Sequence, residues 1–332
     1  MKQYMETKSQ YQDCILFYRL GDFYEMFFDD ALTASRELEI TLTGKNCGQE
    51  ERAPMCGVPY HAVEGYLNKL VSKGYKVAIC EQMEDPKQAK GIVKREVVRI
   101  VTPGTNLDTQ ALDETKNNYI MCIVYIADRY GVSIADITTG DYFVTEMPDS
   151  AKLMDEIYKF MPSEIICNEA FYMSGMDLDG MKDRLGITIF SLDAWYFDDA
   201  ICREKLLDHF KVSSFAGLGL ADYDCGIISA GALLQYLLET QKNSLSNLTH
   251  ITPYAAGKYM MLDSATRRNL ELCETLREKQ KRGSLLWVLD KTRTAMGART
   301  LRKYVEQPLI DKKEILLRLD AVEELKKQAI SR

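Results

Sequence analysis

The stretch from Ile15 to Ala31, ILFYRLGDFYEMFFDDA, constrains the fold more than any other part of the chain. Its first half, Ile15 to Leu20, is an apolar run that predicts a short buried strand. Gly21 interrupts the run, and Asp22 stands where a helix N-cap is expected. A helix is predicted from there, because apolar residues recur at helical spacing and form one stripe of Tyr24, Phe27, Phe28, Ala31, Ala34 and Leu38.

Phe23 falls at the margin of this stripe, in the expected first turn, and Glu25 is expected to point roughly the opposite way. Two interpretations are open. In the first, Phe23 is a core residue and Glu25 completes a capping box with Asp22, where a carboxylate also suits the helix dipole. In the second, Phe23 is a wedge that stacks on a flat group, and Glu25 hydrogen-bonds to that same group.

The first hundred residues predict a compact, mixed α/β domain. Met1–Gln12 is expected to form a short helix or arm before the first strand. Residues 41–60 are expected to form a loop, because Gly and polar residues dominate them. A helix is predicted at His61–Lys73, and strands are predicted at Tyr75–Cys80 and Val93–Val101.

A second domain is predicted after a polar, acidic linker at Thr105–Lys116. Three successive strands with tight turns predict an antiparallel meander at Tyr119–Ile126, Gly131–Ile137 and Tyr142–Glu146. Helices and strands then alternate, with expected helices at Ala151–Phe160 and Gly226–Thr240 and expected strands at Glu164–Cys167 and Ile187–Phe190.

The pattern becomes wholly helical from Asp263 onward. Each expected helix begins at a residue that is a good N-cap. These starting residues are Asp263 or Ser264, Ser284, Thr292 or Thr294, and Asp311, and Pro308 is expected to end the third helix.

The net charge of −7 is unevenly distributed along the chain. Residues 1–102 carry a net charge of −1, residues 103–247 carry −13 and residues 248–332 carry +7. A polyanion such as DNA would therefore avoid the middle of the chain. The basic face of the last part could contact DNA or be the solvated side of packed helices.

Residues 45–102 hold 10 basic and 7 acidic residues, a modest positive surplus. Within them, Lys45, Arg95 and Arg99 are candidates for contact with phosphate groups. Such contacts position a protein on DNA and raise its affinity without reading the sequence. The alternative for each is a solvated surface charge.

Several classes of site are not expected in this chain. Its nine cysteines are an odd number without a C-x-x-C pair, which indicates reduced thiols in a cytosol and argues against disulfides and a zinc site. With three histidines, a His-based metal cluster or triad is not expected, so we assign no metal or catalytic residue. No G-x-x-x-x-G-K-[ST] phosphate loop occurs. No apolar run is long enough to span a bilayer, and the polar start is not a signal peptide.

Several motifs follow one another in a specific order: GDFYE after an FYR strand, CGVPYHAVEGYLNKL, AICEQ and VVRIVTPGT. Together with the later LLQY and LDSATRRNLEL, they resemble the N-terminal part of the bacterial MutS family of DNA mismatch-repair proteins, and the resemblance covers essentially the whole chain. It implies an α/β multidomain protein with a mixed α/β mismatch-recognition domain at 1–102 and a linker at 103–117. A ribonuclease-H-like connector domain at 118–247 and the all-α beginning of a helical core domain at 248–332 would follow.

The resemblance also implies a function and its residues. Phe23 would stack as a wedge on a mismatched or unpaired base in kinked double-stranded DNA, and Glu25 would hydrogen-bond the displaced base. Lys45 and Arg95 match basic positions on the DNA-facing side of the family, which places them ahead of Arg99.

The same resemblance implies partners and a cellular location. The connector would contact a MutL-type repair protein, and the full-length protein would be a cytoplasmic, nucleoid-associated homodimer. ATP and Mg²⁺ would bind only to a C-terminal ATPase domain beyond Arg332, so this chain is expected to have neither a cofactor nor an enzymatic activity.

Two alternatives remain. A ribonuclease-H-like fold suggests a two-metal nuclease with Asp136 as a ligand, but the first strand of the meander lacks the carboxylate that such a site requires. Nuclease activity is therefore not expected. The chain could instead be a protein-interaction scaffold that does not read DNA, with the GDFYE segment as part of the core. Burial of Phe23 would favour the scaffold, and exposure of its ring would favour the wedge.

Overall fold

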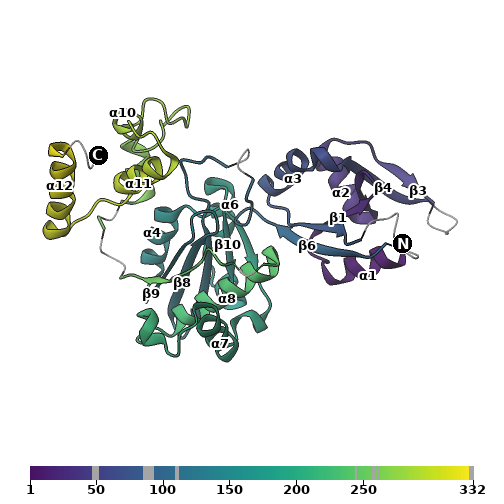
Figure 1. The fold of residues 1–332 in the computed structure, drawn as a ribbon, viewed down its shortest axis with the longest axis horizontal. Coiled ribbons are helices and arrows are strands. Elements are labelled where there is room, and N and C mark those ends of the chain that lie inside the picture. Colours follow the sequence, from purple (N-terminus) through teal and green to yellow (C-terminus); the bar gives the residue numbers. More distant parts are fainter. Residues whose placement is uncertain are drawn as a thin grey trace.

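The computed structural model describes residues 1–46, 52–84, 93–108, 112–243, 245–255, 259–260 and 262–328. They form three units that follow one another along the longest axis of the molecule (Figure 1). The first two units are each built around a six-stranded sheet with helices, and the third is helical. The chain is therefore a mixed α/β protein followed by a helical segment.

The sheet of the first unit has the strand order β3-β4-β2-β1-β5-β6. Its strands are β1 Ile15–Leu20, β2 Phe23–Phe27, β3 Thr43–Lys45, β4 Ala53–Pro59, β5 Val77–Gln82 and β6 Arg95–Val101. β1 and β5 are parallel, and the other pairs are antiparallel. The unit also contains α1 Lys2–Gln10, α2 Phe28–Leu38, the 3-10 helix η1 Tyr60–Ala62 and α3 Val63–Ser72.

The prediction of a helix beginning at Asp22 is wrong in its first part. Leu20 pairs with Phe23, so Gly21 and Asp22 form the two-residue turn of a hairpin between β1 and β2. Gly21 has a φ of +60°, the left-handed conformation that tight hairpin turns require. The aromatic segment FYEMF suits a strand. The helix begins only at Phe28, so Asp22 is not its N-cap and Asp22 and Glu25 form no capping box.

The prediction of a loop over residues 41–60 is also wrong in part. Within that segment, β3 pairs with β4, and residues 55–59 of β4 pair with the whole of β2. Pro54 and Pro59 lie at the ends of β4, and Gly57 interrupts the middle of an otherwise apolar strand. These three residues hid the strand signal in the sequence. Residues 47–51 lie outside the described part of the chain.

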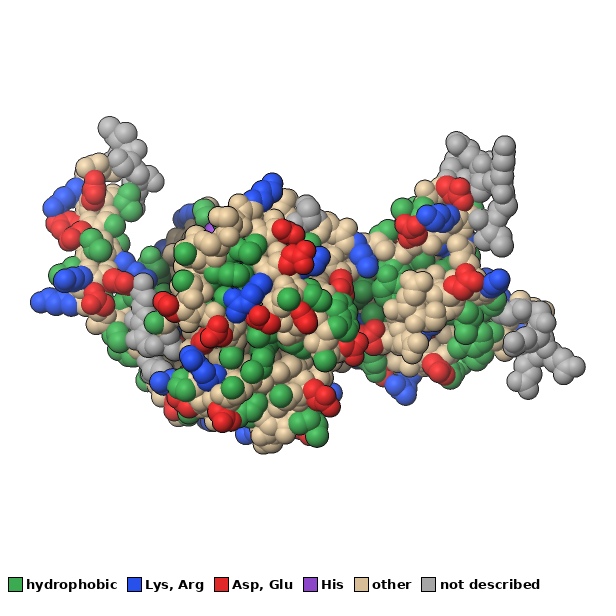
Figure 2. Space-filling view, turned by 90° about the horizontal axis from the view of Figure 1, so that it is seen from below, with side chains coloured by type: hydrophobic (Ala, Val, Ile, Leu, Met, Phe, Trp, Pro, Cys, Tyr) green, Lys and Arg blue, Asp and Glu red, His purple; other side chains and the backbone are tan. Residues whose placement is uncertain are grey.

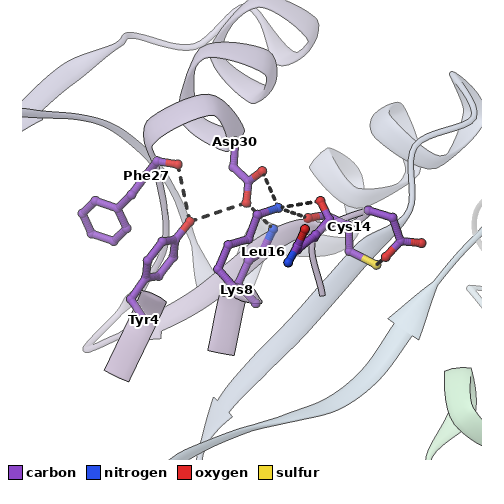
Figure 3. A network of polar contacts seen from close by, with 8 residues as sticks. Tyr4, Lys8, Cys14, Leu16, Phe27 and Asp30 are labelled. Carbon is purple, nitrogen blue, oxygen red and sulfur yellow. Dashed lines mark hydrogen bonds and ion pairs between the residues drawn. The ribbon is translucent and has the colours of Figure 1, made fainter. Parts of the chain in front are cut away.

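Helices cover both faces of the first sheet. α2 and α3 pack on one face, and α1 packs on the other, where Tyr4 is buried against Phe27. The buried Asp30 ties α1 to the sheet (Figure 3). Its carboxylate accepts hydrogen bonds from the Leu16 amide at 3.0 Å and from Lys8 Nζ at 2.9 Å, and Tyr4 Oη lies 3.5 Å away. This network links α1 to α2 and to β1.

The second unit confirms the predicted meander. Its sheet has the order β11-β10-β7-β8-β9-β12, with β7, β8 and β9 antiparallel and β10 parallel to both β7 and β11. The strands are β7 Ile120–Ile126, β8 Arg129–Asp136, β9 Asp141–Met147, β10 Glu164–Cys167, β11 Thr188–Ser191 and β12 Thr252–Pro253. β12 runs parallel to β9.

Helices also cover both faces of this second sheet. α7 Asp199–Phe210 and α8 Cys225–Gln241 pack on one face. The helices of the other face are α4 Ser150–Phe160, α5 Glu169–Tyr172 and α6 Leu178–Leu185, and two 3-10 helices, η2 Ala194–Phe197 and η3 Phe215–Leu218, lie in the connections. In Figure 2, acidic and basic side chains are interspersed with hydrophobic ones across the visible face of this unit.

The beginning of the segment that joins the first two units, residues 102–106, is packed rather than loose. Thr105, within the predicted linker, is buried. The fully buried Glu164 accepts hydrogen bonds from Thr102 Oγ1 at 2.5 Å, from the Gly104 amide at 2.8 Å and from the Tyr236 hydroxyl at 2.6 Å. Burial raises the pKa of the Glu164 carboxyl, although these three donors act in the opposite direction.

The third unit contains α9 Ser264–Asn269, α10 Leu285–Leu289, α11 Ala295–Glu306 and α12 Lys312–Lys327. Their N-caps are Asp263, Ser284, Thr294 and Asp311, each of which accepts a hydrogen bond from a first-turn amide. This confirms the predicted starts and settles the two that were open. α9 ends at Asn269, and the chain turns sharply at Glu271, whose φ is +47°. α12 buries no residue, and Figure 2 shows both charged and hydrophobic side chains on it.

Across the residues that the structure describes, no helix is both long and apolar enough to cross a membrane.

Candidate nucleic-acid interface

Phe23 is exposed at the start of β2, directly after the hairpin turn. Its relative accessibility is 46%, whereas the next residue, Tyr24, is 4% accessible. Side chains alternate between the two faces of a strand, so Phe23 and Glu25 lie on the same face. The expectation that they point in opposite directions is therefore wrong, because it assumed a helix. A strand places the ring and the carboxylate side by side.

The turn that carries Phe23 is held in place by Arg19 and Tyr60. Arg19 Nε donates a hydrogen bond to the Gly21 carbonyl at 2.6 Å, and its guanidinium lies 3.9 Å from the centroid of the Tyr60 ring. The Tyr60 amide donates to the Asp22 carbonyl at 2.9 Å. Both residues of the turn are thus fixed through their backbone, so the Phe23 ring stands on a rigid support.

Sequence reasoning missed Arg19 and Tyr60. The signal for Arg19 was a single cation inside an apolar strand, directly before a turn. Tyr60 comes from the segment predicted as a loop, and its contact with the turn follows from the pairing of β4 with β2.

Glu25 and Lys45 form an ion pair on the same face as Phe23. Lys45 Nζ lies 2.5 Å from Glu25 Oε2 and 5.5 Å from the centroid of the Phe27 ring. The Glu25 side chain is 17% accessible and the Lys45 side chain is 42% accessible. Gly57 is the cross-strand partner of Glu25. Because it has no side chain, it leaves room on β4 beside the carboxylate.

Arg95 lies on the Phe23 face of the sheet but at its other edge. It is the cross-strand partner of Gln82, and its guanidinium is 5.3 Å from the centroid of the Tyr18 ring. Its Nε donates to the Arg19 carbonyl at 2.7 Å, and its Nη1 donates to the Val93 carbonyl at 2.9 Å. Arg95 therefore ties β6 to β1 and brings a positive charge near the turn end of the β1–β2 hairpin.

Arg99 lies on the opposite face. It pairs across the sheet with Ile79, whose side chain belongs to the core under α2 and α3. Its Nη2 donates to Glu64 Oε1 on α3 at 2.9 Å. The structure thus brings Phe23, Glu25, Lys45 and Arg95 to one face and leaves Arg99 apart from them.

The carboxylate of Asp136 is fully engaged in local hydrogen bonds. It accepts from Asn117 Nδ2 at 2.8 Å, from the Asn118 amide at 3.1 Å, and from the amide and hydroxyl of Thr138 at 2.8 and 2.6 Å. These bonds hold the end of β8. Nowhere in the described ranges do three or more His, Cys, Asp or Glu side chains gather into a group that could bind a metal ion.

Three family models match this chain in succession. They are MutS domain I at residues 1–110, MutS domain II at residues 118–252 and MutS domain III at residues 265–332. The Phe23 face lies within the first of these matches.

Similar proteins include the DNA mismatch repair protein MutS of Lachnoclostridium phytofermentans, which is 66% identical over 332 residues. Those of Ruminiclostridium cellulolyticum and Clostridium tetani are 54% identical over 335 residues and 52% identical over 328 residues. The alignments cover 100%, 100% and 98% of this chain, but only 36%, 38% and 36% of the relatives. The chain thus spans little more than a third of their length, and it belongs to the MutS family.

Proposed function

We propose that this chain recognises mismatched or unpaired bases in double-stranded DNA at the Phe23 face of its first sheet, and so contributes to mismatch repair. The observation that carries the proposal is the exposed Phe23 ring beside the Glu25 carboxylate, on a hairpin held at its turn by Arg19 and Tyr60. The names of the similar proteins agree with this role.

Phe23 acts as a wedge. Inserting an apolar side chain between base pairs costs a few kcal/mol in unstacking and kinks the duplex. Stacking of a base on an aromatic ring returns about 1–3 kcal/mol and tolerates any base. Because a mispaired step unstacks at lower cost than a paired one, the same wedge favours the mismatch. The exposure of Phe23 supports this role over a purely structural one.

Glu25 distinguishes mismatched DNA from perfectly paired DNA. A carboxylate near phosphate groups is repelled, which weakens binding to perfectly paired DNA. A displaced base that offers a hydrogen-bond donor to Glu25 compensates for this repulsion. Charge-assisted hydrogen bonds of this kind are among the stronger ones in proteins. Lys45 and Arg95, on the same face, are the residues from which we expect phosphate contacts.

Fluorescence anisotropy at low salt tests the proposal. A duplex with one G·T mismatch and its G·C counterpart are titrated with the wild-type chain, with Phe23→Ala and with Tyr172→Ala as a control. Tyr172 is 47% accessible and lies in the second unit. We expect a mismatch preference that Phe23→Ala abolishes and Tyr172→Ala preserves. A preference that survives Phe23→Ala, or its absence from the wild type, would contradict the proposal.

We further infer that the second unit is a connector domain of the ribonuclease-H-like class that binds a MutL-type protein. The order of its first five strands, three antiparallel followed by two parallel to the first, supports the class. Its strongly acidic sequence supports a protein rather than DNA as its partner.

The activities of the whole protein belong to our proposal as well. We assign ATP and Mg²⁺ binding, hydrolysis and homodimerisation to other parts of the protein, and no catalytic step to the residues described here. The place of action that we propose is the bacterial cytoplasm, at the nucleoid.

A further inference from the structure

We propose that Lys45 sets the mismatch specificity of this chain by holding Glu25 in an ion pair until a mismatched base competes for the carboxylate. This inference rests on the proposed function of Phe23 and Glu25. It assigns Lys45 a positioning role that a simple phosphate contact would not have. The ligand that displaces Lys45 is a hydrogen-bond donor on the edge of a displaced base.

The geometry of the sheet brings Lys45 to Glu25 from two strands away. Lys45 ends β3 and Glu25 lies on β2, so the strand β4 separates them. The lysine side chain nevertheless reaches the carboxylate, with Nζ 2.5 Å from Oε2. At the position on β4 opposite Glu25 stands Gly57, where even a Cβ atom would lie 3.6 Å from Glu25 Cγ and 3.2 Å from the Tyr24 carbonyl oxygen. A glycine there places no side chain of β4 directly beside Glu25.

The Lys45–Glu25 ion pair is accessible to water, which makes it weak. The Glu25 side chain is 17% accessible and that of Lys45 is 42% accessible, so water reaches both charges. Ion pairs of this kind contribute little free energy, because water and salt screen them. A base donor that approaches Glu25 can therefore displace Lys45 at small cost.

The charges of Lys45 and Glu25 determine how replacing Lys45 should change the affinities for the two duplexes. While Lys45 is paired with Glu25, its positive charge offsets the negative charge of the carboxylate, so Glu25 repels matched DNA only weakly. Without the lysine, the carboxylate repels matched DNA in full, whereas a mismatched duplex recovers part of this loss through the hydrogen bond to Glu25. Replacing Lys45 should therefore weaken binding to both duplexes but raise the ratio of mismatched to matched affinity.

A double-mutant cycle tests this. Dissociation constants for the G·T and G·C duplexes are measured for the wild type, Lys45→Met, Glu25→Gln and the double variant. We expect Lys45→Met to raise the G·T to G·C affinity ratio about two- to fivefold, the size typical of a partly exposed ion pair. In the Glu25→Gln background the same change should leave the ratio unaltered. Lys45→Arg, which can restore the pair, should behave as the wild type.

The chain offers a matched control. Lys73 pairs with Glu37 at 3.0 Å, with side-chain accessibilities of 48% and 18%. It is the C-cap residue of α3, which lies on the opposite face of the sheet from Phe23. Lys73→Met removes a similar ion pair and the same charge, so it should leave the affinity ratio unchanged. A rise in the ratio in this variant would mean that net charge, not the Lys45–Glu25 pair, sets specificity.

The outcomes separate this inference from the proposed function. If Phe23→Ala abolishes the mismatch preference but Lys45→Met weakens both duplexes equally in either Glu25 background, Lys45 is only a phosphate contact and the inference is wrong. If Phe23→Ala preserves the preference, the proposed function fails first. Thermal unfolding of each variant verifies folding. Should Lys45→Met prove unfolded, Lys45→Gln takes its place, with the same expected ratio and the same contradicting result.

Discussion

Two carboxylates, Glu25 in the first unit and Glu164 in the second, are arranged in opposite ways. On the Phe23 face, Glu25 is partly exposed and forms an ion pair with the more exposed side chain of Lys45. In the second unit, Glu164 is fully buried and accepts three hydrogen bonds from the backbone and side chains around it. The Glu25 carboxylate can therefore exchange its partner for another group. The Glu164 carboxylate cannot, because all of its hydrogen bonds hold neighbouring parts of the chain together. This difference is what separates a candidate binding group from a structural one.

Of the effects expected at these two carboxylates, the largest is a loss of stability when Glu164 is replaced. Glu164→Ala would leave the Thr102 hydroxyl, the Gly104 amide and the Tyr236 hydroxyl without their acceptor in a buried site. Unmade buried hydrogen bonds of this kind are costly, and we expect a loss of about 3 kcal/mol in the free energy of unfolding. Urea unfolding measures this, with the exposed Glu169→Ala as the control. A loss as small as that of the control would remove the contrast between the two units.

The burial of Glu164 should also make the stability of the chain depend on pH. The pKa of Glu164 is raised in the folded chain, so the folded state binds this proton more tightly than the unfolded state does. Its contribution therefore favours folding below the unfolded pKa and is lost as the pH rises through the folded pKa.

Comparison with Glu164→Gln isolates this contribution. The free energy of unfolding of the wild type minus that of Glu164→Gln, measured in urea from pH 4.5 upward, should fall with increasing pH. A difference that stays constant or rises would show that the pKa is not raised.

Phe23→Ala should give a smaller effect on stability despite its expected loss of mismatch preference. The ring is 46% accessible, and substitutions at exposed positions usually change stability by less than about 1 kcal/mol. Phe17→Ala, at a fully buried ring on the neighbouring strand, provides the contrast with about 3–5 kcal/mol. Thermal unfolding distinguishes the two. Comparable losses would mean that Phe23 is part of the core.

The smallest expected effect is on affinity for matched DNA. Glu25→Gln removes the repulsive charge and releases Lys45 from its ion pair, so the G·C duplex should bind about two- to fivefold more tightly while mismatch binding persists. Anisotropy titrations with the G·C duplex measure this change, and Glu37→Gln on α2 is the control. Unchanged affinity for the G·C duplex would refute a discriminating role for Glu25.

The sequence predicted some elements of this fold well and misplaced others, for identifiable reasons. Glu164–Cys167 is a strand with the predicted bounds, because a short apolar run between turn residues has few other conformations. The segment from Asp22 to Phe27 satisfies both a helical and a strand pattern over a few residues. Its pairing with β4, which follows some thirty residues later, decides between them, and that pairing is invisible locally.

The arrangement of the site residues was likewise hidden in the sequence, because it depends on how distant strands pair. Phe23 and Glu25 were both predicted as site residues, but their shared face followed only from the strand. Arg95 and Arg99 are four residues apart, and in a regular strand they would share a face. A bulge between their pairing positions, at Ile79 and Cys80, places them on opposite faces. The pairing of Lys45 with Glu25 depends on the register across three strands, which the sequence pattern does not specify.

The most direct measurement replaces Phe23 by tryptophan in a chain whose own tryptophans, Trp195 and Trp287, are changed to phenylalanine. Indole fluorescence is then followed as the G·T and G·C duplexes are added, with binding of each confirmed by anisotropy. The wedge predicts that the mismatched duplex quenches the fluorescence, because the ring stacks on a base, and that the bound matched duplex does so far less. Equal quenching by both duplexes, or none when both are bound, would contradict the stacking of residue 23 on a mispaired base.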